Sequence, residues 1–262
     1  MDNGILIAPR EIPYDELAHL GLDRQMVDDL PQPAMDSLLQ SRPTPLLSLR
    51  IERPDGGVKD FHGRVMLLKF DDDNVHAVVI PRMKTIMGLE DFDMDEQEHL
   101  LGGNVLKIKE PTGSYYAQLD KVTNQVLKME SAGIDYNMSV ISGNENNAKY
   151  FSTTSLTDLS EGRPVTLQND EGPGMCTIGI DLLTPTGIRF SAGGIDAFEK
   201  DKRTDDMMRY SFGNFGCWTL TDDDSLKYTK EEDYSPEMRK IQSDYLSGRK
   251  AGEDNRKQQN IS

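Results

Sequence analysis

The chain has 262 residues, of which 29 are Lys or Arg and 45 are Asp or Glu, so its formal net charge is −16 and its pI is near 4.6. This charge excludes a generic cationic nucleic-acid-binding protein, because phosphate groups would repel it. Apolar residues including tyrosine make up 36% of the chain, which is lean for one large core. Because small units bury proportionally less surface, we expect several small modules in series.

The sequence indicates a reduced, cytoplasmic protein. The first ten residues lack the cationic and apolar regions of a signal peptide. No window approaches the roughly 18 consecutive apolar residues of a membrane span, so no membrane partner is expected. Cys176 and Cys217 show no redox or metal-binding spacing such as C-x-x-C, and we expect both thiols to be structural.

The chain begins with a compact group of short helices. Between Ile12 and Gln40, proline, glycine and aspartate residues stand where helices start and stop, which predicts three of them. The segment resembles a helix-turn-helix in outline only. It holds six acids and one base, so phosphate would repel a recognition helix placed there.

A helix followed by a three-stranded meander is then predicted three times. The helices are expected to stop at Ser41, Gly103 and Gly162, which are separated by 62 and 59 positions. The expected strands cover 47–51, 64–70, 75–80, 105–108, 115–119, 126–129, 165–167, 176–183 and 188–190. The pattern predicts a degenerate module of about sixty residues, used three times.

The expected fold class is α+β, with a short helical N-terminal lead-in, repeated small helix-plus-antiparallel-meander modules and a disordered C-terminal tail. We divide the chain into the lead-in with the first β module at 1–85, a second helix-meander module at 86–150, a third module with an aromatic-rich extension at 151–235, and a basic, partly disordered tail at 236–262. The tail carries six bases against four acids, and a helix is expected to stop there at Gly248. The elements within 191–235 are left unplaced.

The usual signatures of catalysis and cofactor binding are absent from the sequence. No P-loop, G-x-G-x-x-G or G-x-S-x-G motif occurs, and the four histidines have no metal-ligand spacing. Asp91–Asp95 places carboxylates at positions one, three and five of an EF-hand. However, Glu96 and Gly102 occupy the positions that require Gly and Glu. We therefore predict no catalytic residues, no metal, no cofactor and no small-molecule ligand.

A basic residue directly follows several of the expected helix stops. Arg42, Arg163 and Arg249 hold this position, with Lys250 beside the last, whereas Asn104 holds it in the second module. One explanation is favourable placement near a helix C-terminus. The other is a row of guanidinium groups that grips an acidic partner or a phosphate backbone. These four basic residues are the candidate partner-binding residues.

Three stretches, Ile12–Leu22, Leu38–Leu46 and Leu119–Val126, resemble the uncharacterised domain families of proteins encoded on conjugative and mobilisable elements of anaerobic gut bacteria. The likeness extends over about residues 10 to 190, and the aromatic-rich part from 191 onward departs from it. The resemblance implies a cytoplasmic accessory protein in a mobile-element setting. It supplies no catalytic residues.

These features predict a non-enzymatic binding or adaptor protein of a mobile genetic element. Its strongly acidic body favours a basic protein partner, such as a DNA-processing enzyme, over nucleic acid. One alternative is a nucleic-acid-binding accessory protein that uses the basic tail and exposed arginines. A second alternative is an unrecognised enzyme with a carboxylate-based site assembled from different modules.

Overall fold

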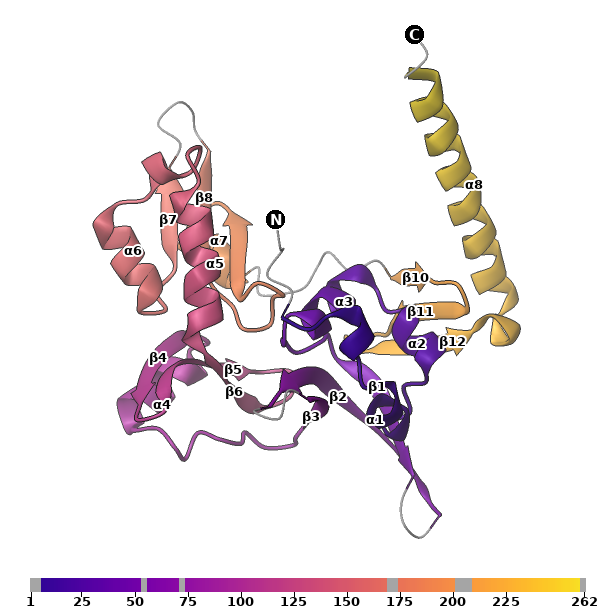
Figure 1. Ribbon diagram of the computed structural model, residues 1–262, viewed down its shortest axis with the longest axis horizontal. Helices are drawn as coiled ribbons and strands as arrows, with labels where there is room; N and C mark the ends of the chain where they lie inside the picture. Colours follow the sequence, from indigo (N-terminus) through magenta and orange to yellow (C-terminus); the bar gives the residue numbers. More distant parts are fainter. Residues whose placement is uncertain (1–5, 53–55, 71–73, 169–173, 201–208, 260–262) are drawn as a thin grey trace.

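The computed structural model describes residues 6–52, 56–70, 74–168, 174–200 and 209–259, with the side chains of Glu52, Lys200 and 248–259 left aside. Helices and small, mainly antiparallel sheets confirm the α+β fold class. Figure 1 shows two lobes side by side, from which a long C-terminal helix extends. We call them the first lobe, which holds the N-terminal helices, and the second lobe, which holds the second and third modules.

The first lobe packs three short helices against a six-stranded sheet in the order β10-β11-β12-β1-β2-β3. Its elements are η1 (Pro9–Glu11), α1 (Tyr14–His19), α2 (Arg24–Asp28), α3 (Gln32–Leu39), β1 (Leu47–Glu52), β2 (Val58–Lys69), β3 (Val75–Pro81), β10 (Tyr210–Phe212), β11 (Gly216–Leu220) and β12 (Leu226–Lys230). The helices bury Leu17, Val27 and Leu38 against Leu47 and Trp218 of the sheet. Pro33 and Asp23 sit at the helix starts as the sequence predicts, and Asp23 accepts the Met26 N–H at 3.0 Å.

The C-terminal strands join the first lobe and do not extend the third module. β12 pairs with β1 in parallel, with Leu47 opposite Leu226, whereas the other strand pairs of the sheet are antiparallel. The predicted division at 151–235 therefore differs from the structure, which places 210–230 beside β1. The sequence does not predict this pairing, because the two strands are separated by most of the chain.

The second lobe contains the second and third modules. Its elements are α4 (Met94–Leu101), β4 (Val105–Glu110), β5 (Gly113–Asp120), β6 (Gln125–Glu130), α5 (Ser131–Gly143), η2 (Ala148–Tyr150), α6 (Thr153–Ser160), β7 (Val165–Gln168), β8 (Met175–Ile180), β9 (Ile188–Ala192) and α7 (Ile195–Lys200). Each sheet is a three-stranded antiparallel meander in chain order. The two sheets share a core in which Ile134 and Met138 of α5 lie among apolar side chains of both.

The predicted repeat is confirmed. A helix followed by an antiparallel meander occurs as α3 with β1–β3, α4 with β4–β6, and α6 with β7–β9. The expected helix stops Ser41, Gly103 and Gly162 all have left-handed backbone, with φ of 52°, 86° and 89°. A Cβ on Gly162 would lie 2.5 Å from the Val105 carbonyl oxygen, so glycine also permits the close approach of modules 2 and 3.

A buried ion pair joins the two lobes. Arg64 of β2 donates to both carboxylate oxygens of Asp120 at the end of β5, at 2.6 and 3.2 Å, and also to the Thr44 carbonyl at 2.9 Å. Burial alone would raise the pKa of Asp120. The Arg64 charge and the hydrogen bonds from Arg64, Thr123 and the Val122 N–H outweigh burial and lower that pKa.

The C-terminal segment forms η3 (Glu231–Asp233) and the single helix α8 (Pro236–Gln259). Phe212 of the edge strand β10 lies 5.9 Å, between ring centroids, from both Tyr234 and Tyr245. These rings fix the first turns of α8, and Figure 1 shows the rest leading away from the sheet. The helix runs through Gly248, so the predicted stop there is wrong. The end of the predicted disordered tail, 260–262, lies outside the described residues.

Candidate functional site

Segment 82–93 follows the edge of β6 and leads into α4. The Met83 N–H donates to the Thr123 carbonyl at 2.8 Å and the Met87 N–H to the Asn124 carbonyl at 2.9 Å. Farther along, Leu89 and Phe92 pack with buried Leu100 against the sheet of module 2. At Asp93, a capping box opens α4, in which Asp93 accepts the Glu96 N–H at 2.9 Å. The segment is therefore held in place at both ends.

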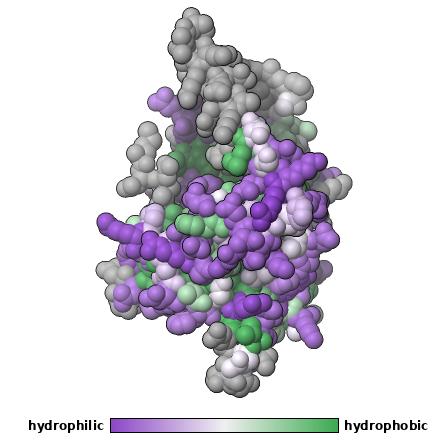
Figure 2. All heavy atoms as spheres, turned by 90° about the vertical axis from the view of Figure 1, so that its right-hand side faces the viewer, coloured by the Kyte–Doolittle hydropathy of each residue, from purple (hydrophilic) through white to green (hydrophobic). Residues whose placement is uncertain are grey.

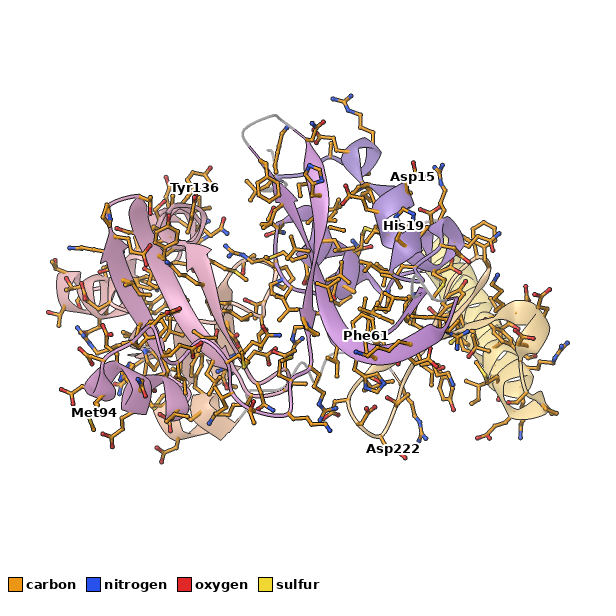
Figure 3. All side chains as sticks on the ribbon, turned by 90° about the horizontal axis from the view of Figure 1, so that it is seen from below. Asp15, His19, Phe61, Met94, Tyr136 and Asp222 are labelled. Carbon is orange, nitrogen blue, oxygen red and sulfur yellow. The ribbon has the colours of Figure 1, made fainter. Side chains whose placement is uncertain are left out.

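Large apolar side chains of this segment and of α4 project into solvent. Met94 is 85% exposed, and Ile86, Met87 and Leu101 are also exposed. Figure 3 shows Met94 on α4 at the outer end of the second lobe. Flexible methionine side chains are frequent on surfaces that bind protein partners, because they adapt to different shapes.

The same segment is strongly acidic. Residues 86–101 contain six acids and no Lys or Arg. Five of these acids are exposed, namely Glu90, Asp91, Asp93, Asp95 and Glu98. Among the described residues, none of these five acids forms an ion pair. We call these five acids, with Ile86, Met87, Met94 and Leu101, the α4 surface.

A cavity of about 340 Å³ lies between α5, α6 and the sheet of module 2. At one end, the Tyr116 hydroxyl lies 2.7 Å from Asp135 Oδ1, and Lys107 Nζ lies 3.3 Å from Asp135 Oδ2. Burial and the Asp135 carboxylate raise the pKa of Tyr116 far above its ordinary value, so its hydroxyl stays protonated. The three groups therefore bind one another at this end of the cavity.

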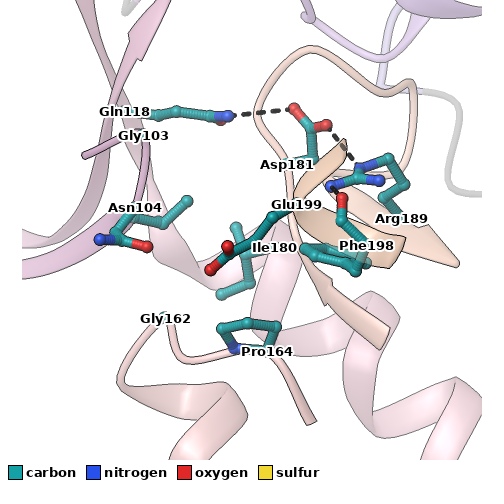
Figure 4. A pocket seen from close by; sticks show the side chains of 11 residues that line it. Gly103, Asn104, Gln118, Gly162, Pro164, Ile180, Asp181, Arg189, Phe198 and Glu199 are labelled. Atoms are coloured by element: carbon teal, nitrogen blue, oxygen red, sulfur yellow. Dashed lines mark hydrogen bonds and ion pairs between the residues drawn. The ribbon is translucent and has the colours of Figure 1, made fainter. Parts of the chain in front are cut away.

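A second, smaller cavity lies between modules 2 and 3, and Figure 4 shows the side chains that line it. Asp181 holds Arg189 at 3.0 Å and faces the Gln118 amide at 3.3 Å. The Arg189 guanidinium lies 3.6 Å from the centre of the Phe198 ring. Only about 20 Å³ is left for the centre of a water-sized molecule, which is room for about one water. These contacts stabilise the interface between the modules.

Of the four predicted partner-binding residues, the structure describes the side chains of two, Arg42 and Arg163. Arg42 is 7% exposed and lies at the junction of modules, so the expectation of an exposed guanidinium is wrong there. Arg163 is exposed and binds Asp158 of its own module at 2.7 Å. The side chains of Arg249 and Lys250 lie outside the described residues.

The α4 surface was not predicted as a site. In the sequence, residues 91–96 indicate only a helix start and an incomplete EF-hand. A usable signal was present in Met94, a large apolar residue at a solvent-facing position within a run of acids. Single exposed apolar residues are common on protein surfaces, so Met94 alone does not predict a binding site. The structure shows four exposed large apolar side chains within residues 86–101, which does favour one.

Other site classes were searched for in the described part of the chain. It contains no cluster of three or more His, Cys, Asp or Glu side chains arranged to hold a metal ion. Within the same residues, no helix has the length and apolar character needed to cross a membrane. Cys176 and Cys217 are both free thiols.

Comparisons with protein-family models, curated proteins and solved structures give no match to this chain. The function must therefore be inferred from the surfaces and cavities themselves.

Proposed function

We propose that the protein is a non-enzymatic binding or adaptor protein whose α4 surface engages a basic protein partner. One observation carries this proposal. Residues 86–101 contain six acids and no Lys or Arg, and they also expose four large apolar side chains, namely Met94, Met87, Ile86 and Leu101. Covering an exposed methionine side chain contributes about 1.5–3 kcal/mol. The surrounding carboxylates would select a partner rich in Lys and Arg and speed its association.

The other faces and cavities support this choice. Figure 2 views the molecule from the α8 side, where hydrophilic side chains cover most of the described surface and apolar ones form small separate patches. The cavity beside Tyr116 has no unpartnered catalytic group. Arg42 is buried and Arg163 binds Asp158, so these two arginines do not form a row of guanidinium groups that could hold a phosphate backbone. A basic protein thus fits the described surface better than nucleic acid does.

The proposal also includes the biological setting, which is a mobile genetic element. The resemblance of Ile12–Leu22 and Leu119–Val126 to proteins of conjugative elements favours a cytoplasmic accessory protein of a mobile genetic element. The partner would then be a basic protein involved in DNA processing or transfer.

Charge reversal on the α4 surface tests the proposal. The variant Asp91→Lys/Asp95→Lys/Glu98→Lys leaves the capping residues Asp93 and Glu96 intact. The matched control Asp15→Lys/Asp222→Lys/Glu232→Lys changes the net charge equally at exposed acids elsewhere. Tagged full-length proteins are used to capture partners from cells that naturally produce the chain, at about 50 and about 500 mM salt.

The wild type and the control variant should retain a basic protein at low salt, and the α4 variant should lose it. High salt should release that protein from the wild type and from the control variant, because the contact is largely electrostatic. Equal retention by all three proteins would contradict the proposal. Recovery of nucleic acid without a protein would also contradict it.

A further inference from the structure

Arg42 is a buried cation at the junction of the three modules. It follows the end of α3, and its side chain reaches the C-terminal end of β6, where Nη1 lies 2.8 Å from the Met129 sulfur. Its Nε atom is buried and has no hydrogen-bond partner in the described structure. The Nε–H and Nη2–H groups form the guanidinium edge that commonly holds a carboxylate or phosphate through two hydrogen bonds. In Arg42 the Nε–H has no acceptor and is covered by protein, so only the Nη2 side of this edge can meet a ligand.

Arg42 also lacks a counter-ion among the residues that the structure describes. Arg64 and Arg189, which are largely buried as well, hold Asp120 and Asp181. For Arg42, burial alone accounts for a pKa lowered to about 10, with no contribution from a neighbouring acid. A buried charge without a partner is unfavourable, and proteins avoid it unless another group compensates.

The N-terminus of α5 lies beside this guanidinium. Arg42 Nη2 is 4.0 Å from the position that a Cβ of Gly133, the third residue of the helix, would take. The 13-residue helix has no side-chain cap, and the first residue, buried Ser131, makes no side-chain hydrogen bond in the described structure. The first N–H groups of a helix lack partners within it and carry partial positive charge. Ala132 and Gly133 are exposed, so solvent reaches this end.

We propose that Arg42 and the first turn of α5 form a binding site for an oxyanion, namely a carboxylate or phosphate group of a small molecule. The Nη2–H group, which lies beside α5, would hold one oxygen, and the backbone N–H groups of the helix start would hold and compensate the remaining charge. Gly133 leaves open the space that a side chain would otherwise fill. This ligand site is separate from the α4 surface and does not depend on the proposed protein partner.

The test compares Arg42→Met with the wild type and with Arg163→Met, which removes the exposed arginine at the corresponding position of module 3. Melting temperatures are measured in chloride buffer while sodium phosphate or sodium acetate replaces sodium chloride at constant ionic strength. The wild type and Arg163→Met should show a saturable rise with at least one oxyanion. Arg42→Met should lose this response, with an apparent affinity at least about tenfold weaker. Any general salting effect of phosphate is shared by all three proteins.

The backbone amide resonances of Ala132 and Gly133 provide a direct readout on the wild type, which also serves if Arg42→Met fails to fold. They should shift on titration with the same apparent affinity as the thermal response. A response to phosphate alone assigns a phosphorylated ligand, and a response to acetate assigns a carboxylate. The proposal is overturned if Arg42→Met responds like the wild type, or if neither anion shifts these amides.

Discussion

At the residue scale, buried charge separates structural residues from candidate functional ones. Arg64 and Asp120 form a complete, bidentate pair between the lobes. Arg42, buried to a similar degree, has only the Met129 sulfur and no acid. The sequence could identify Arg42 as a notable position after a helix stop. It could not show burial, because the surrounding groups come from β6, α5 and the turn before β9.

Replacement of Arg64 by Met should destabilise the protein by about 3–5 kcal/mol, because it leaves Asp120 buried and unpaired. Chemical denaturation measures the loss. The matched control is Arg50→Met, which removes the exposed Arg50–Asp60 pair and should cost far less, because solvent screens an exposed ion pair. Similar losses for both variants would contradict the assignment of Arg64 and Asp120 as a buried link between the lobes.

Arg42→Met should behave in the opposite way in buffer without oxyanions. It removes an unpaired buried charge and retains an unbranched side chain of useful volume, so stability should stay within about 1 kcal/mol of the wild type or increase. The same denaturation experiment measures this. A loss as large as that of Arg64→Met would show that Arg42 has a structural partner.

The Asp120 carboxylate should contribute to stability in a pH-dependent way. Its pKa in the folded protein is below the ordinary value of 3.8. Its ionised form therefore stabilises the fold fully above that value, and the contribution is lost as pH falls through the folded pKa. The stability difference between wild type and Asp120→Asn should be constant near neutral pH and shrink below about pH 4. A difference that grows on acidification would contradict the direction of this shift.

At the element scale, local sequence signals were sufficient to predict the helices and strands of the three modules. Capping residues, glycine stops and alternating apolar residues act within a few positions, so the helix-and-meander pattern could be predicted. The stop at Gly248 failed because α8 continues past it. A glycine within a helix costs only about 1 kcal/mol, which the neighbouring helical residues can outweigh.

Gly162→Ala should be strongly destabilising because two effects combine. The φ of 89° is unfavourable for alanine, and the new Cβ would lie 2.5 Å from the Val105 oxygen. We expect a loss of at least about 2 kcal/mol by chemical denaturation. Gly143→Ala, at the end of α5 with no atom within 4 Å of the new Cβ, should cause no loss. Equal tolerance at both positions would contradict close packing between modules 2 and 3.

At the scale of the whole molecule, the chain closes on itself when β12 pairs with β1. This contact could not be predicted, because parallel pairing leaves no local turn signal and the two strands are far apart in sequence. The result is a first lobe built from both ends of the chain, with Trp218 of β11 fully buried in its core. The second lobe lies between these ends in sequence and carries the α4 surface.

Leu226→Ala should destabilise the first lobe by about 2–5 kcal/mol, since this fully buried side chain of β12 packs beneath the N-terminal helices. Trp218 is the only tryptophan, so its fluorescence during chemical unfolding follows this lobe. Leu246→Ala on the exposed side of α8 is the control and should change little. An unaltered transition in Leu226→Ala would contradict closure of the first sheet by the C-terminal strands.

The α4 surface is tested most directly by photo-crosslinking in extracts of cells that naturally produce the protein, at low and at high salt. A benzophenone side chain replaces Met94, and the control replaces Tyr136, which is 62% exposed and lies on a different side of the lobe in Figure 3. We predict one basic protein crosslinked from position 94, lost at high salt, and no such product from position 136. Absence of a product from position 94, or equal products from both positions, would contradict the account.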